Sequence, residues 1–514
     1  MKKICIALMV LSTTFLFAKG DNVKIGWGRE DITPKGPAML AGQMSKRLST
    51  SVLDPLSTTA LALESGKTKV IMISLDNVGF RAPLMNAIRK NVAKATGLND
   101  ILIIGSATHT HTAPRYGVVI PIGKTAKDVD EKGKGYGSNG IDVAAIRKEH
   151  PDFVDSEQYF DFLVEKISAA ALNAWNSRKP GKIAYGLGSA AVGECRRLVV
   201  KNKGGVMYAM EDDPAVLNAE AHVDHSLNVL ATYTPAGKLT GMVLNLACPS
   251  QVSEALKVVS ADFWNEVRVD VAKRWGKDVY ILPQCSPAGD QSPHKLMNRR
   301  ADERMMRLRG QLKKPVKGWK WVDRVYDLEY GLGRRREIAR MITASLEDVL
   351  PTIAKTAESK MVMKSSQKTI NLPPRLITKQ EYEEAKKDIA KILEIQKKEK
   401  VDHSGSINWH KRVITRYETQ QKFIPMELNV VRLGDVVFAT NTYELYLDYG
   451  DRIKGRSKAV QSFLVQLASG TSTYLASKRS GTTGYGSAPA SVLISYEGGD
   501  TLVEETVKAI NELF

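Results

Sequence analysis

Two histidines stand two residues apart, His109 and His111, directly after the apolar run 101–104. Because α/β folds keep their ligands at the carboxyl ends of buried strands, we expect both imidazoles to project from a strand end. Imidazole is the commonest metal ligand in proteins, and the small Thr and Ala neighbours leave room for a substrate. The whole chain has eight histidines, so this pair indicates a metal or catalytic site better than it indicates two surface histidines.

A serine in a second motif could also take part in chemistry. Ser292 lies in a Gly-Asp-Gln-Ser-Pro turn after the apolar run 279–283. Such a turn exposes a hydroxyl beside backbone N–H groups, as a nucleophile requires, although an ordinary turn serine is the alternative. His294 follows Ser292-Pro293, and this proximity makes it a catalytic candidate, although a weaker one than Ser292. His222 and His225 are three residues apart before a predicted strand, and we interpret them as structural.

The elements that must position these residues alternate along the chain. This alternation predicts an α/β fold, with one large catalytic domain over residues 21–514 whose mixed sheets are flanked by helices. The predicted strands are 70–75, 101–104, 227–233, 242–247 and 279–283, and the predicted helices are 82–95, 159–177 and 261–275. A long loop is expected over 123–142. A charged helical insertion is expected over 376–421, and its Glu-to-Lys spacings over 376–400 are typical of a solvated face without a functional role.

The N-terminus and the cysteines indicate the compartment. Residues 1–20 have the pattern of a secretory signal peptide whose apolar run is too short to span a membrane. We therefore expect an exported protein, secreted or in a bacterial periplasm. Loss of Cys5 with the signal leaves Cys195, Cys248 and Cys285, too few for a disulfide scaffold. A chain with 43% hydrophobic residues can instead be held together by a core.

The net charge is strongly positive. The formal value is +18, and removal of the three lysines in the signal leaves +15. A basic protein suits an acidic partner, such as a membrane surface or an anionic glycan, although the excess charge also fits a role in solubility alone. RNP, zinc-finger and helix-turn-helix signatures are absent from the sequence, so we expect no nucleic-acid partner. The expected partner is a small-molecule, lipid or glycan substrate, with peripheral contact to a membrane surface as a further option.

Taken together, the motifs resemble the catalytic domain of the neutral/alkaline (non-lysosomal) ceramidases, zinc amidases that cleave the N-acyl bond of ceramide. The resemblance extends from about residue 24 to the C-terminus and depends on the order and spacing of several motifs. These are Gly26–Pro34, Asp76, Thr108–His111, Gly289–Pro293, Glu444, Gly450, Tyr474 and Tyr485.

The resemblance implies a Zn²⁺ cofactor and a role for each matching residue. His109, Glu444 and Tyr474 match metal ligands. His111 matches the histidine that faces the scissile amide, Ser292 a nucleophile or substrate polariser, Arg196 an arginine that contacts the reacting group, and Tyr485 a tyrosine near the substrate. A hydrolytic zinc needs three or four such ligands and an open position, and a neighbouring imidazole can move the proton. The simpler interpretations are a helix N-terminal carboxylate for Glu444 and packing for the two tyrosines.

The chain departs from the family pattern in two places. Cys248 precedes Pro249 where the ceramidases have a second histidine ligand. Because thiolate binds zinc well, Cys248 is predicted as the replacement ligand; the alternatives are a small buried core residue and a metal neighbour at Gln251. The immunoglobulin-like C-terminal domain of the ceramidases also has no counterpart here, which argues against ceramide itself as the substrate.

Three functions remain open from the sequence. The first is a secreted zinc-dependent hydrolase of the neutral ceramidase superfamily that cleaves an amide or ester. The second is a hydrolase that acts on a polysaccharide or its decoration, which export and basic charge favour. The third is a metal-free binding or scaffold protein that has lost a ligand. Bound zinc distinguishes the two enzymes from the scaffold.

Overall fold

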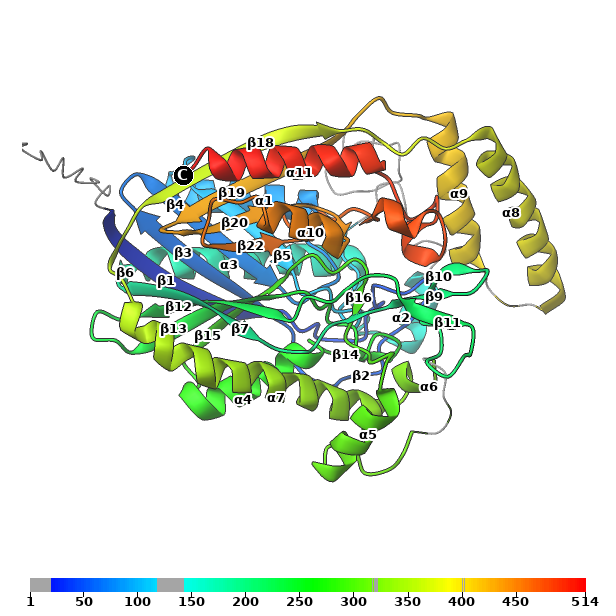
Figure 1. The fold of residues 1–514 in the computed structure, drawn as a ribbon, viewed down its shortest axis with the longest axis horizontal. Coiled ribbons are helices and arrows are strands. Elements are labelled where there is room, and N and C mark those ends of the chain that lie inside the picture. Colours follow the sequence, from blue (N-terminus) through cyan, green and yellow to red (C-terminus); the bar gives the residue numbers. More distant parts are fainter. Residues whose placement is uncertain (1–19, 118–142, 317, 319–321, 400, 402) are drawn as a thin grey trace, which may run out of the picture.

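The computed structural model describes residues 20–117, 143–316, 318, 322–399, 401 and 403–514. Residues 1–19 of the predicted signal and the predicted loop over 123–142 lie outside these residues. Three mixed sheets face one another, and helices cover their outer faces (Figure 1). The prediction of an α/β fold is confirmed. Among the described residues, no helix is long and apolar enough to cross a membrane.

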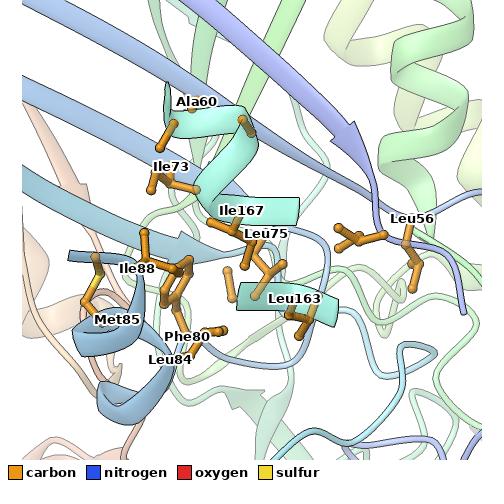
Figure 2. Packing of buried hydrophobic residues seen from close by; sticks show 14 of the residues in the cluster. Leu56, Ala60, Ile73, Leu75, Phe80, Leu84, Met85, Ile88, Leu163 and Ile167 are labelled. Atoms are coloured by element: carbon orange, nitrogen blue, oxygen red, sulfur yellow. The ribbon is translucent and has the colours of Figure 1, made fainter. Parts of the chain in front are cut away.

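The first sheet comes mainly from the N-terminal part of the chain. Its strands are β17 (Lys360–Met361), β1 (Asp21–Asp31), β3 (Ser57–Ser65), β4 (Thr68–Leu75) and β5 (Leu102–Ala107), with β6 (Lys179–Pro180) beside β1. Helices α1 (Ala82–Thr96) and α3 (Ser156–Asn176) pack on its outer face, where Leu75, Leu84 and Leu163 share one apolar cluster (Figure 2). Gly105 of β5 lies against the Phe80 ring, and a Cβ there would approach that ring to 2.6 Å. A glycine is therefore required at this contact.

In the second and third sheets, as in the first, helices cover the outer face. The second contains β7 (Lys182–Ser189), β12 (Ser226–Tyr233), β13 (Leu239–Leu246) and β15 (Tyr280–Cys285), covered by α4 (Phe263–Trp275) and α7 (Leu328–Ile353). The third contains β18 (Met363–Leu372), β19 (Ile424–Leu433), β20 (Val436–Thr440) and β22 (Gln461–Val465), covered by α10 (Leu447–Lys454) and α11 (Tyr496–Asn511). In Figure 1, α7 and α11 lie on opposite sides of the molecule.

One apolar core joins the inner faces of the three sheets. It includes Trp27 and Leu61 from the first sheet, Val243 from the second, and Phe438 and Phe463 from the third. The indole Nε1 of Trp27 donates a hydrogen bond of 3.0 Å to the hydroxyl of Thr232 on the second sheet. The three sheets therefore form one packed unit.

The remaining elements are short or peripheral. They are β2 (Ser51–Val52), β8 (Glu194–Cys195), β9 (Arg197–Val200), β10 (Gly204–Met207), β11 (Val216–Ala219), β14 (Val258–Val259), β16 (Gln291–Ser292), β21 (Glu444–Leu445), β23 (Tyr474–Leu475), α2 (Val143–Glu149), α5 (Arg299–Leu308), α6 (Val322–Val325), α8 (Lys379–Glu399) and α9 (Ser404–Glu418). The helix predicted over 376–400 is α8, and α9 pairs with it at one end of the molecule (Figure 1). The eight strands and helices predicted over residues 70–283 are all present, with ends shifted by a few residues.

Each large sheet contains one parallel pair of strands: β4–β5, β13–β15 and β20–β22. The segments that follow the carboxyl ends of β5, β13, β15, β20 and β22 carry the polar side chains described next. Such carboxyl ends are where open α/β sheets place their ligands.

Candidate functional site

His109 follows β5 in a strained backbone conformation, with φ of 66°. Non-glycine residues adopt positive φ rarely, and such strain is concentrated at functional sites. Its Nδ1 lies 2.6 Å from the carbonyl oxygen of Val78, so Nδ1 carries the proton. Nε2 is buried, without a hydrogen bond, 3.3 Å from Oε2 of Glu444. Burial lowers the pKa of His109, but Glu444 and the Val78 carbonyl outweigh burial and raise it above its ordinary value.

Glu444 and Tyr474 lie side by side. β21 and β23 form a short parallel pair whose register places Glu444 opposite Tyr474. Burial raises the pKa of Glu444, but His109, Arg196 and a hydrogen bond from Tyr474 outweigh burial and lower it. Burial raises the pKa of the Tyr474 phenol well above its ordinary value. A carboxylate and a phenol oxygen therefore converge beside the imidazole of His109.

Arg196 places a buried positive charge beside His109, Glu444 and Tyr474. Its guanidinium donates to the carbonyl oxygen of Gly289 at 2.7 Å and lies 5.3 Å from the ring centre of Tyr474. Burial opposes its charge, but Tyr474, Tyr208 and Glu444 raise the pKa of Arg196 well above its ordinary value. The guanidinium is therefore permanently charged, and its Nε has no hydrogen-bond partner among the described residues.

His111 is held between two side chains that follow β13. Its Nδ1 lies 3.1 Å from Oε2 of Glu254, and its Nε2 lies 2.8 Å from the amide nitrogen of Gln251. The Gln43 amide donates to the same carboxylate oxygen of Glu254 at 3.0 Å. Burial lowers the pKa of His111. Burial raises the pKa of Glu254, but its hydrogen bond with His111 and nearby positive charge outweigh burial and lower it.

Arg47 ties the segments around His111 together. Its guanidinium donates to the carbonyl oxygens of Ala41 at 2.5 Å, His111 at 2.7 Å, Glu254 at 2.7 Å and Leu256 at 2.8 Å. One buried side chain therefore joins the N-terminal loop, the histidine segment and the Glu254 segment.

Ser292 lies in the short strand β16 and is fully buried, whereas the sequence predicts an exposed turn position. Pairing of β16 with β8 withdraws the serine from solvent. Its hydroxyl accepts from the backbone N–H of His294 at 3.2 Å and lies 3.5 Å from the hydroxyl of Tyr208. Tyr208 is also hydrogen-bonded to Arg196, so Ser292 is connected to the same polar group.

Tyr485 lies at the outer end of the group. Its ring meets the Tyr474 ring edge-on, with centres 5.8 Å apart, and stacks on the Trp409 ring of α9, with centres 4.8 Å apart. Tyr485 is 36% exposed, whereas Tyr474 is 7% exposed. The aromatic side chains therefore lead from the buried centre to the surface.

Cys248 lies elsewhere. Its sulfur is buried in the apolar cluster of the second sheet, with Leu246 and Val252, and its nearest hydrogen-bond acceptors are backbone carbonyl oxygens at 3.7 Å. Burial raises the pKa of the thiol well above its ordinary value, so it stays protonated. β13 ends at Leu246, the N–H of Cys248 donates to the Leu246 carbonyl oxygen in the turn that follows, and both side chains lie in the same apolar cluster. The predicted ligand set is corrected accordingly, and Cys248 is left out.

The two histidines interpreted as structural lie apart from this group. His222 is exposed and forms an ion pair with Asp451 at 2.9 Å. The backbone carbonyl of His225 accepts a hydrogen bond from Ala190. His294 is different, because its buried Nε2 donates to the carbonyl oxygen of Gln251 at 3.0 Å and burial lowers its pKa to about 4.

Sequence reasoning did not find Glu254, Tyr208 and Trp409, nor Arg47 and Gln43, which contact the segments around His111. Glu254 had a usable signal, since it is a charged residue shortly after a buried strand that ends at the ligand-binding edge. Tyr208 follows the short strand β10, and Trp409 lies in α9, after the range 376–400 whose charge pattern is typical of a solvated face. These two carried no signal in the sequence.

The geometry of these residues can be compared with the ligand geometry of a zinc ion. With Nδ1 of His109 protonated, its Nε2 and the Glu444 carboxylate are two acceptors that face each other at 3.3 Å. Ligands about 2.0–2.1 Å from one tetrahedral ion lie about 3.3–3.4 Å apart, so this pair fits a shared cation. Among the described residues, His, Cys, Asp and Glu alone form no group of three that could hold a metal. A third donor would have to be another kind of side chain, and the phenol of Tyr474 lies beside Glu444.

The fold and this buried group define an α/β protein with a polar site where three sheets converge. Its fold is that of the neutral ceramidases. The neutral ceramidase from Pseudomonas aeruginosa superposes with a TM-score of 0.65 and 14% identity, over 96% of this chain and 74% of that one. A second structure, a ceramidase complexed with C2, gives a TM-score of 0.64 and 13% identity, over 96% and 75%. The predicted resemblance is confirmed at the level of the fold. No family profile and no curated protein matches the sequence.

Proposed function

We propose that this protein is a zinc-dependent hydrolase that cleaves an amide or an ester. The observation that carries the proposal is the acceptor pair formed by His109 Nε2 and Glu444, with Tyr474 beside it and the cationic Arg196 in the same buried group. Because Glu444 raises the pKa of His109, this pair favours a positive charge between its two atoms, which is either a proton on Nε2 or a metal cation in its place. We further propose export from the cell, on the pattern of residues 1–20.

His109, Glu444 and Tyr474 would hold the ion. When bound, Zn²⁺ supplies Lewis-acid polarisation of the scissile carbonyl and lowers the pKa of a water molecule. The rest of the chemistry belongs to the protein. Arg196 is a fixed positive charge where negative charge develops on the carbonyl oxygen, which is the kind of preorganised electrostatics that lowers barriers most.

His111 is the proton carrier of this proposal. Because burial lowers its pKa, its imidazole is neutral at pH 7 and can accept a proton. The Glu254 carboxylate at Nδ1 fixes the ring and stabilises the imidazolium once it forms. Proton transfer at Nε2 requires the substrate to displace the Gln251 amide from its contact with that nitrogen. Ser292 is the nucleophile or polariser of the carbonyl, with Tyr208 as its neighbour.

The test combines metal analysis with turnover. Purified protein is dialysed against zinc, and bound metal is counted by mass spectrometry; one zinc per chain is expected in the wild type and none in His109→Ala. Release of primary amine from short-chain N-acylated lipids and sugars, and of acid from p-nitrophenyl esters, is then followed. Wild-type protein that binds no zinc and cleaves none of these compounds would instead indicate a binding or scaffold protein.

A further inference from the structure

The α8–α9 hairpin contributes a side chain to the site. Trp409 of α9 stacks on Tyr485 with an interplanar angle of 17°, and Tyr485 in turn meets the buried Tyr474. In Figure 1, α9 lies beside the segment that carries Tyr485. Helix α9 therefore places an aromatic ring at the outer end of the proposed active site.

Both aromatic rings are held by fixed backbone. Arg416 of α9 donates to the carbonyl oxygens of Pro489 at 2.5 Å and Arg375 at 2.7 Å, which anchors the helix. At the other ring, Gly484 and Gly486 flank Tyr485, and a Cβ at either would meet Arg197 or Tyr446 within 3 Å. The aromatic pair is therefore a built surface with little freedom to collapse.

A cation lies next to this pair. Arg412 is three residues after Trp409 on α9, so the two side chains share a face of the helix. Arg412 is exposed, and its charge acts on the Tyr485 hydroxyl. Within the described part of the chain it forms no hydrogen bond or ion pair. Arg479, in the segment before Tyr485, is paired with Asp448, whereas Lys411 of α9, like Arg412, forms no ion pair with a described residue.

We propose that Trp409, Tyr485 and Arg412 form an outer substrate subsite that binds an acidic sugar ring, so that the hydrolase acts on an anionic glycan. This inference rests on the proposed function and names its substrate class. An aromatic surface packs against the apolar face of a sugar ring, and a guanidinium pairs in bidentate fashion with a carboxylate or sulfate. A hydrocarbon chain would use the rings but leave the guanidinium without a partner. The excess positive charge of the chain, +18, favours the same class.

Binding of matched oligosaccharides tests the subsite. The probes are tetrasaccharides of hyaluronan and chondroitin sulfate, which are acidic, and chitotetraose, which is neutral; all three carry N-acetyl groups. Titration calorimetry of the wild-type chain should show about tenfold tighter binding of an acidic probe than of chitotetraose. Arg412→Gln should abolish this preference. Lys411→Gln is the matched control, because it removes the same charge from a residue about 200° around α9 from Trp409 and should preserve the preference.

The aromatic part has its own variants. Trp409→Ala should weaken binding of acidic and neutral probes alike by about tenfold, and Trp409→Phe should retain most of it. A melting temperature for each variant separates loss of binding from loss of the fold. The proposal is overturned if no acidic probe binds more tightly than chitotetraose, if Arg412→Gln and Lys411→Gln behave alike, or if these variants reduce binding only to phosphatidylglycerol vesicles.

The hydrolysis assay is run separately on the same variants. If an acidic probe binds through Arg412 but is never cleaved, the proposed hydrolase activity is contradicted and the proposed binding site is supported. If N-acyl bonds are cleaved equally well by the wild type and by the Trp409 and Arg412 variants, the proposed subsite is contradicted and the proposed hydrolase activity is supported.

Discussion

Glu444 and Tyr474 are direct register partners in the short parallel pair of β21 and β23. Glu444 follows the carboxyl end of β20, and Tyr474 follows that of its parallel partner β22. Both oxygen donors are therefore positioned by one sheet. His109 is the donor from another sheet. Formation of the three-donor set therefore depends on how two sheets pack together, and it can be tested one residue at a time.

Replacement of Glu444 by Gln should remove zinc and activity together. The amide keeps the size of the side chain but loses the negative charge that faces His109 at 3.3 Å. We expect kcat/KM to fall at least about 100-fold, with zinc lost in the metal analysis. Glu427→Gln is the control, because Glu427 is paired with Arg89 outside the site and should affect stability alone. Full zinc content in Glu444→Gln would contradict the proposed ligand set.

Replacement of Glu254 by Gln should slow turnover without loss of zinc. Glu254 contacts His111 at 3.1 Å and forms no ion pair with the three proposed ligands within the described part of the chain. Since the imidazolium would lose its carboxylate partner, kcat should fall about 10²–10⁴-fold while KM changes little. Glu254→Asp should recover part of the rate. Equal effects on kcat and KM in both variants would assign Glu254 a purely structural role.

Replacement of Ser292 by Ala separates two kinds of attack. The hydroxyl is close to Tyr208 and the His294 N–H, and zinc binding should not depend on it. If Ser292 attacks or polarises the carbonyl, kcat falls about 100-fold or more at full zinc occupancy. Wild-type turnover in this variant would exclude the serine and leave activated water as the nucleophile.

Replacement of Cys248 by Ser should lower stability and leave zinc unchanged. A hydroxyl in the apolar cluster of the second sheet should lower the free energy of unfolding by about 1–3 kcal/mol, measured by urea denaturation. Cys248→Ala lacks a polar group and should cost less. Loss of zinc at an unchanged melting temperature would restore the sulfur as a ligand.

His294 should make stability depend on pH. Its pKa is about 4 in the folded protein and about 6.5 when unfolded, so between these values the unfolded chain binds the additional proton. The neutral, buried His294 therefore contributes to the free energy of unfolding above pH 6.5. This contribution is lost as the pH falls through the window, by about 3 kcal/mol between pH 7 and pH 4. The free energy of unfolding of His294→Gln, measured over the same range, should decline less steeply than that of the wild type. Parallel curves would contradict this assignment.

Local patterns predicted much of the structure because the relevant forces act locally. The strands and helices between residues 70 and 283 follow from the periodicity of apolar residues, and His109 and His111 are neighbours in sequence as well as in space. The convergence of Glu444 and Tyr474 with His109 came from the resemblance to a family and not from the residues alone.

The remainder depends on packing that no local pattern encodes. The contact of Trp409 with Tyr485 joins a surface helix to a distant loop, and the charge pattern of the helix is the same with or without that contact. Cys248 shows the opposite case. Its position before Pro249 favoured a ligand, whereas the turn after β13 places its side chain with that of Leu246 in the apolar core.

The four carbonyl contacts of Arg47 also have a kinetic consequence. They join a residue near the N-terminus to segments at 111 and 254–256, so the loop around Arg47 cannot close before those segments have been synthesised and packed. Contacts between such distant residues slow folding because a long loop of chain must be ordered first. The polar centre should thus be among the last parts to mature, and recovered activity should lag behind recovered secondary structure when the denatured chain refolds.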